Sequence, residues 1–380
     1  MAKKIRYGMV GGSMQAFIGE VHRKAINFDP RVELVAGCFS TREALNKETG
    51  ETYGLDPERV YADYKVMAEK EAARDDGIDF VSIVTPNSTH YPVAKAFLEA
   101  GINVVCEKPL CFTVEQAEDL KATAEAKGLL FGVTHGYTGY CMSRVMREMV
   151  AEGKIGKVVS VNAEYAQDWL LDELDPDNKA ELNMAVWRTD PKMTGASNCV
   201  GDIGTHIENY VAFITGLKIK RLLATTNTYG KALDLNANII VEYDNGANGA
   251  YWCSQVAAGH CNGLAVRIYG DKGSLEWAQE TPDVVRYTPK NCAPQLIQRN
   301  TAAVTEKAGA CARIPSGHPE GLYVAFANLY QNYVSALIAK RNGEDASQFI
   351  YPTVDEGIEG VKFVHAVVES AANNSKWVEM

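Results

Sequence analysis

The sequence lacks the features that mark several specialised classes of protein. No apolar run approaches the roughly 18 residues of a membrane-spanning helix, and no block of lysine and arginine points to nucleic acid or an anionic membrane as a partner. The nine cysteines include no Cys-x-x-Cys pair, and their odd number argues against both a structural zinc site and a disulfide framework. Internal repeats and low-complexity tracts are absent too. We therefore expect reduced thiols and no metal.

What is present is ordinary for a globular protein, with 46% hydrophobic and 23% charged residues and a net charge of −10. A chain of 380 residues is long enough for two domains, each with its own core. We place them at 1–135 and 136–380, where the sequence pattern changes. The N-terminal residues enter an expected strand without a signal-peptide-like apolar segment, so we predict a cytoplasmic protein.

In the first domain, short apolar runs alternate with helical patterns. The expected strands are 5–10, 32–39, 80–84, 104–106 and 129–134. Alternation of this kind with short connections predicts an α/β fold with a doubly wound parallel sheet, the Rossmann arrangement.

The second domain reads as α+β, with a large, mostly antiparallel open sheet. Its expected strands are 158–165, 221–229, 237–243, 249–255 and 265–269. Residues 289–320 have poor periodicity and predict a surface loop, whereas 326–338 and 352–370 predict helices, the last of them packing back on the first domain. One face of the sheet would cover helices and the other would be available for subunit contact.

The turn after the first expected strand is rich in small residues and leads into a helical pattern. Its candidate cofactor-binding residues are Gly11, Gly12, Ser13 and Met14. Strand, glycine turn and helix form the context of a dinucleotide fingerprint, in which Ala16 would allow close packing of helix on strand. Ser13 stands where the second glycine of that fingerprint is usual, and a plain strand-to-helix turn is the alternative.

The end of the second expected strand carries Ser40, Thr41 and Arg42 where many Rossmann folds have an acid for the adenosine ribose. Ser40 and Arg42 are able to accept a 2′-phosphate, which favours NADP, but a serine hydroxyl also suits the ribose of NAD. Ser40 with Glu43 is alternatively a helix capping box that needs no ligand.

The next three expected strands all end in polar residues. The candidates are Thr85, Pro86, Asn87 and His90 after the first, Glu107 and Lys108 after the second, and His135 and Tyr137 after the third. Because the carboxyl ends of parallel strands share one edge, these clusters converge where open α/β sheets bind ligands. Taken alone, Lys108 before Pro109 is also compatible with an ordinary exposed turn lysine.

A second cluster lies in the other domain. If a helix begins near Asp202, that acid and His206 share one face and suit proton transfer to a substrate hydroxyl. An N-capping Asp202 with an unrelated histidine is the alternative. Further candidate substrate ligands are Tyr165, Gln167, Trp187, Arg188 and Asp190. His318 and Glu320, at the end of the expected loop, would contact a sugar from a lid or, alternatively, bridge subunits or a turn.

Four motifs occur in the order of one known family: the glycine turn, Thr85-Pro86-Asn87, Glu107-Lys108-Pro109, and Gly201-Asp202-Ile203-Gly204-Thr205-His206. With them the chain resembles the Gfo/Idh/MocA oxidoreductases over essentially its whole length. Segments 187–191 and 317–321 are similar to its sugar and glycoside dehydrogenase branch, which includes levoglucosan dehydrogenase and glucoside 3-dehydrogenases.

The resemblance implies an NAD(P)-dependent dehydrogenase for a secondary hydroxyl of a sugar or glycoside. C3 of a glucoside is one candidate position for the oxidation, and NAD is slightly favoured as the cofactor. It places Lys108 beside the nicotinamide and the reacting hydroxyl, makes His206 the acid/base and Asp202 a ligand, and sets Asn87 and Glu107 along the nicotinamide ribose. It also implies a homo-oligomer, a dimer or tetramer or larger. Two alternatives remain open: a redox-neutral enzyme with tightly bound NAD, and a non-catalytic regulatory protein.

Overall fold

The structure, a computed structural model, describes residues 4–175 and 186–380, which form two compact units. The first unit consists of Met1–Gly136 and Leu322–Ile358, and the second of Tyr137–Gly321 and Glu359–Met380. The predicted division at residue 135 differs from these units at residues 322–358, which the sequence assigns to the second domain. A helix in that segment completes the core of the first unit.

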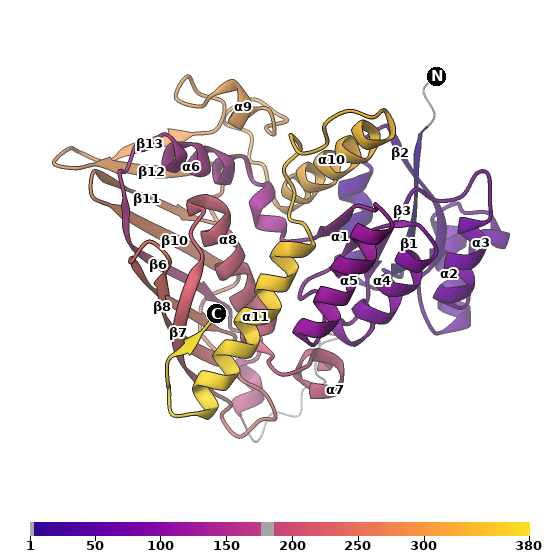
Figure 1. The fold of residues 1–380 in the computed structure, drawn as a ribbon, viewed down its shortest axis with the longest axis horizontal. Coiled ribbons are helices and arrows are strands. Elements are labelled where there is room, and N and C mark those ends of the chain that lie inside the picture. The colour runs from indigo at the N-terminus through magenta and orange to yellow at the C-terminus, as the bar shows by residue number, and fades with distance from the viewer. Residues whose placement is uncertain (1–3, 176–185) are drawn as a thin grey trace. The chain divides into compact units, whose positions relative to one another are not determined.

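The described part of the first unit contains a parallel sheet of five strands in the order β2-β1-β3-β4-β5. Three of these strands, β1, β2 and β3, are labelled in Figure 1. The strands are β1 (Ile5–Gly11), β2 (Val32–Cys38), β3 (Phe80–Val84), β4 (Asn103–Cys106) and β5 (Phe131–Val133). Every residue of β3 is buried, as a central strand covered on both faces requires. The predicted Rossmann sheet is confirmed, and β3, β4 and β5 are neighbours, so their carboxyl ends share one edge.

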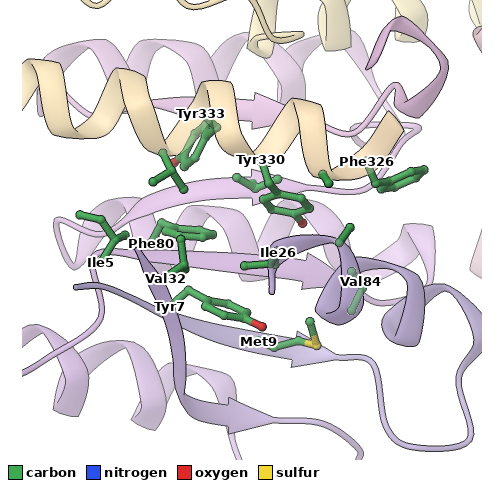
Figure 2. Close-up of a cluster of buried hydrophobic side chains, with 14 of the residues drawn as sticks. Ile5, Tyr7, Met9, Ile26, Val32, Phe80, Val84, Phe326, Tyr330 and Tyr333 are labelled. Atoms are coloured by element: carbon green, nitrogen blue, oxygen red, sulfur yellow. The ribbon is translucent and has the colours of Figure 1, made fainter. Parts of the chain in front are cut away.

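Helices pack on this sheet in two groups. The helices are α1 (Phe17–Ile26), α2 (Glu43–Thr52), α3 (Tyr64–Ala72), α4 (His90–Glu99), α5 (Val114–Ala126) and α10 (Leu322–Arg341). Helix α1 contacts α10, whereas α4 contacts α3 and α5. Figure 2 shows Tyr330 and Tyr333 of α10 pointing toward Phe80 of the sheet, and Phe326 and Tyr7 belong to the same buried apolar cluster. Residues far apart in sequence therefore make this core.

The described part of the second unit contains a sheet of nine strands in the order β13-β12-β11-β10-β6-β9-β8-β7-β14. The strands are β6 (Val158–Ala166), β7 (Ile219–Asn227), β8 (Asn236–Tyr243), β9 (Asn248–Ser254), β10 (Gly263–Gly270), β11 (Gly273–Ala278), β12 (Val284–Pro289), β13 (Gln295–Gln298) and β14 (Val378–Glu379). All neighbours are antiparallel except β6 and β9, which run parallel. The predicted sheet is confirmed, but the loop expected at 289–320 contributes β13 and a short helix.

Burial alternates along these strands, so one face is apolar and covered, as in β8 with Ile239 buried and Ile240 exposed. The helices are α6 (Cys141–Ala151), α7 (Pro191–Thr194), α8 (Thr205–Thr215), α9 (Glu306–Gly309) and α11 (Val354–Ala372). Helix α6 contacts α8 and α9, and α8 contacts β6. Among the described residues, no helix combines the length and apolarity that crossing a bilayer requires.

Candidate active site

The turn between β1 and α1 has the backbone of a phosphate cradle. Gly11 and Gly12 have φ of +78° and +71°, a region that favours glycine. A Cβ on Gly19 would lie 2.2 Å from the Cα of Gly12, so Gly19 provides the close approach that the sequence assigned to Ala16. Ala16 is instead the N-cap of α1 and makes no side-chain cap, leaving backbone N–H groups directed at the turn. Ser13 is buried in the turn, and Met14 is partly exposed.

The residues after β2 lie next to this turn. The Ser40 hydroxyl accepts a hydrogen bond from the Arg42 N–H at 3.1 Å, and Arg42 Nη2 donates to Gln15 Oε1 at 2.8 Å. Helix α2 begins at Glu43 with Arg42 as its N-cap and no side-chain cap. The alternative of a Ser40–Glu43 capping box is therefore wrong. Thr41 and Arg42 are exposed at this position.

The carboxyl end of β3 carries the second group of candidates. Asn87 is buried, and the buried Thr85 Oγ1 has no hydrogen-bond partner among the described residues. His90 is fully buried, with Nδ1 2.8 Å from the Pro109 carbonyl and Nε2 2.9 Å from the Thr85 carbonyl. The His90 ring therefore connects the end of β3, where Pro86 also lies, to the segment after Lys108. Each of its two ring nitrogens is within hydrogen-bond distance of a backbone carbonyl.

Glu107 and Lys108 follow β4 at the same edge. The carboxylate of Glu107 is buried, with Oε1 2.7 Å from His22 Nε2 and also bonded to the Thr134 hydroxyl, while Oε2 accepts the Lys108 N–H at 3.2 Å. Burial would raise the pKa of Glu107, but the bonds from His22 and Thr134 and the charges of His22 and Lys108 outweigh it and lower the pKa to about 2. Glu107 is thus an ionised carboxylate at neutral pH, beside a partly buried lysine whose peptide bond to Pro109 is cis.

His135, after β5, is the third strand-end candidate. It is buried, and burial together with the charge of Lys108 lowers its pKa to about 3, against the opposing effect of Glu107. A neutral imidazole at this edge is a hydrogen-bonding group and adds no second positive charge to that of Lys108.

In the second unit, Asp202 lies in a π-helical turn (Val200–Gly204) that runs directly into α8. Gln255 Nε2 donates to Asp202 Oδ2 at 2.9 Å, and Arg188 Nε lies 3.4 Å from Oδ1. The N-cap of α8 is Gly204, so the alternative of an N-capping Asp202 is wrong. π-Helical turns are rare and often occur at functional sites.

His206, in the first turn of α8, lies against two tyrosines. Its ring centroid is 4.6 Å from that of Tyr137 and 6.0 Å from that of Tyr165. The two tyrosine hydroxyls are 2.5 Å apart, and Tyr165 donates to Asn262 Oδ1, which also accepts from Gln167. Burial raises the pKa of both tyrosines, so they stay neutral hydrogen-bonding groups.

The remaining candidates divide into two sets. The Arg188 guanidinium stacks 4.6 Å over the Trp187 ring and reaches Asp202, which joins both residues to the Asp202 group. Asp190, in contrast, caps α7 by accepting the Lys192 N–H at 2.9 Å. Glu320 is buried, and its carboxylate accepts hydrogen bonds from the backbone N–H groups of residues 313 and 314, so it stabilises its own loop. The His318 side chain is exposed.

Three residues of these groups lie outside the sequence motifs described above, and two of them have a recognisable signal in the sequence. His22 falls four residues after Ile18 on the buried face of α1, where a polar side chain requires a partner. Gly19 falls two helical turns after Gly12. Asp234, which accepts the N–H groups of Asn198 and Val200 and so holds the π-helical turn, gives no local signal.

Comparisons with known proteins agree with this geometry. Residues 5–135 match the oxidoreductase family with an NAD-binding Rossmann fold, and residues 143–276 match the GFO/IDH/MocA C-terminal domain. The uncharacterized oxidoreductase YfiI of Bacillus subtilis is 37% identical, over 100% of this chain and 98% of its own. The chain belongs to the Gfo/Idh/MocA family of oxidoreductases.

Solved structures of this family include inositol dehydrogenase homologs from Azotobacter vinelandii. The complex with NAD+ has a TM-score of 0.95 at 38% identity, and the complex with NADH and myo-inositol has 0.93 at 37%, each covering 100% of this chain and 98% of theirs. The chain is accordingly an NAD-binding oxidoreductase. The positive φ of Gly11 and Gly12, the uncapped start of α1 and the space kept by Gly19 fit the NAD pyrophosphate.

Proposed function

We propose that this enzyme oxidises a secondary ring hydroxyl of a cyclic polyol or sugar, a class that includes inositols and glucosides reacting at C3. The observation that carries the proposal is Lys108, a cation at the carboxyl end of β4 beside the ionised Glu107 in an NAD-binding sheet. A related structure at 37% identity holds NADH and myo-inositol, which supports a cyclic polyol as the first substrate to test.

In this proposal the bound NAD supplies the hydride acceptor, and the residues of the chain manage charge and protons. His206 accepts the proton of the reacting hydroxyl, while the Lys108 ammonium stabilises the negative charge that develops on that oxygen. Asp202, held by Gln255 and Arg188, fixes the orientation of the substrate. A bound NAD+ would take up the hydride of the carbinol carbon, so that this carbon becomes a ketone while the proton of its hydroxyl group is held by His206.

The role of Lys108 is tested with Lys108→Met, which keeps the length of the side chain but removes its charge. We expect kcat to fall by about 100-fold or more, because this is the usual loss on removing a group that stabilises transition-state charge. NAD affinity, measured by isothermal titration calorimetry, should stay close to that of the wild type. Lys65→Met, on an exposed position of α3, is the matched control. Turnover of Lys108→Met near the wild-type rate would refute the role.

The substrate class is tested by following NADH formation with a panel of myo-inositol, D-glucose, levoglucosan, simple β-glucosides and open-chain primary alcohols. We expect turnover with members that present a secondary ring hydroxyl and none with open-chain primary alcohols. His206→Asn should lower kcat on each active substrate, since an amide cannot take the proton. Turnover restricted to non-polyol alcohols would contradict the proposal.

A further inference from the structure

A chain of buried hydrogen bonds connects three elements of the first unit, α1, α10 and β3, to Glu107. His22 of α1 is fully buried, and its Nε2 lies 2.7 Å from Glu107 Oε1. Its Nδ1 lies 2.6 Å from the hydroxyl of Tyr330 on α10, and that hydroxyl lies 2.8 Å from Ser82 Oγ on β3. We call Ser82, Tyr330, His22 and Glu107 the His22 chain.

The acceptor at one end of the His22 chain decides which atom of His22 donates there. An ionised carboxylate only accepts, so His22 Nε2 carries the hydrogen that is donated to Glu107. On the other side of the ring, His22 Nδ1 is hydrogen-bonded to the Tyr330 hydroxyl, and that hydroxyl is hydrogen-bonded to Ser82 Oγ. The Tyr330 hydroxyl thereby holds the His22 ring in the orientation in which Nε2 faces Glu107.

The same carboxylate is bonded to the backbone of Lys108. Glu107 Oε2 accepts the Lys108 N–H at 3.2 Å, while Oε1 takes the bonds from His22 and Thr134. A carboxylate that is held in one orientation also fixes the position of the Lys108 N–H group, which donates a hydrogen bond to it. The backbone position of Lys108 therefore depends on His22, although His22 is in none of the four motifs named in the sequence analysis.

We propose that His22 is a positioning residue, which holds the Glu107 carboxylate and through it the backbone at Lys108, with Tyr330 fixing the orientation of the His22 ring. The inference rests on the proposed function only in the part that Lys108 plays in turnover. The hold on Glu107 is a property of the folded first unit and is measurable without substrate.

Other charged or titratable groups also surround Glu107, and the test has to separate them from His22. They are Cys106 and Lys108 on either side of it, His90 of α4, His135 after β5 and Tyr330 of α10. The side-chain hydrogen bonds that lower the pKa of the carboxylate come from His22 and Thr134. Replacing His22 is therefore expected to change the pKa of Glu107 most directly.

Substitution of His22 by glutamine or by asparagine distinguishes a positioning role from a packing role, because the two side-chain amides reach the places of different imidazole nitrogens. The amide nitrogen of His22→Gln reaches the place of Nε2 and keeps a donor for Glu107, whereas that of His22→Asn reaches only the place of Nδ1. We expect His22→Gln to keep kcat within a few-fold of the wild type and His22→Asn to lower it about tenfold, the effect of losing one charge-assisted bond. NAD affinity should be the same in both variants.

The second readout needs no substrate. In protein labelled with carbon-13 at glutamate carboxyls, with Glu107→Gln to assign the signal, we expect His22→Asn to raise the pKa of Glu107 by about one unit or more. His22→Gln keeps the donor to the carboxylate and should raise this pKa by less than His22→Asn does. Tyr330→Phe keeps the ring packing and should raise this pKa by a smaller amount, so it replaces His22→Asn if that variant does not fold.

The outcomes are distinct. Equal kcat values for the Gln and Asn variants together with an unchanged Glu107 titration would overturn the inference, because His22 would then act only through packing. If the wild type transfers no hydride from any polyol or sugar, the proposed function fails, while the titration of Glu107 still decides the role of His22.

Discussion

Arg42 is placed by its hydrogen bond to Gln15, and this sets what it contributes to cofactor choice. The guanidinium donates to an amide oxygen in the glycine turn and is otherwise exposed, with the Ser40 hydroxyl bonded to its own N–H. A neutral ribose hydroxyl gains little from such a charge, but a 2′-phosphate would gain a charge-assisted bond. The related inositol dehydrogenase homologs hold NAD+ or NADH, and we expect Arg42 to add some capacity for NADP.

We predict that Arg42→Gln lowers kcat/KM for NADP about tenfold while changing that for NAD less than about threefold, in line with the loss of one charge-assisted bond. Arg42→Lys keeps the charge and should keep most of the NADP activity. The ratio of the two kcat/KM values, measured with one substrate, is the quantity to compare. An unchanged ratio in Arg42→Gln would mean that Arg42 does not approach the 2′ position.

The elements of both units follow closely from the sequence, while their exact junctions do not. Every strand predicted for the first unit is present, because apolar β-branched runs between helical patterns are a strong signal. The start of α1 depends on a contact between Gly12 and Gly19 that periodicity alone does not specify. The π-helical turn before α8 depends on Asp234, which lies outside its own segment. Local pattern therefore predicts the element, and tertiary contacts set its ends.

Gly19→Ala tests the packing of α1 on the glycine turn. The added Cβ would lie 2.2 Å from the Gly12 Cα, so the helix or the turn must shift. We expect a destabilisation of about 1–3 kcal/mol and a clear loss of NAD affinity, since the cradle itself moves. Gly321→Ala, where a Cβ meets no heavy atom within 4 Å, is the matched control for the same substitution. Urea unfolding and calorimetric NAD titration give the two quantities, and normal NAD binding by Gly19→Ala would contradict the assignment.

For the whole molecule, the two units differ from the predicted domains because neither unit is one continuous stretch of the chain. The first unit is discontinuous, because residues 322–358 return to a sheet built by the first 136 residues. Tyr330 is 308 positions from His22, and pairing over that distance leaves no trace in local sequence. The polar clusters at strand ends were predictable, since parallel topology brings them to one edge. Their buried partners were not, because only the folded core determines which helix covers them.

This discontinuity predicts which fragment folds alone. Residues 1–136 lack α10, whose Phe326, Tyr330 and Tyr333 cover the sheet, and exposing such a face would cost roughly 5–10 kcal/mol, comparable with the stability of a whole domain. Residue 136 lies beside Phe326, since a Cβ on Gly136 would be 2.3 Å from that ring, so a short Gly/Ser linker can join 136 to 322. We expect the linked fragment, 1–136 joined to 322–358, to unfold cooperatively in circular dichroism and to bind NAD. The fragment 1–136 should do neither, and NAD binding by it at wild-type affinity would show that α10 is dispensable for the cofactor site.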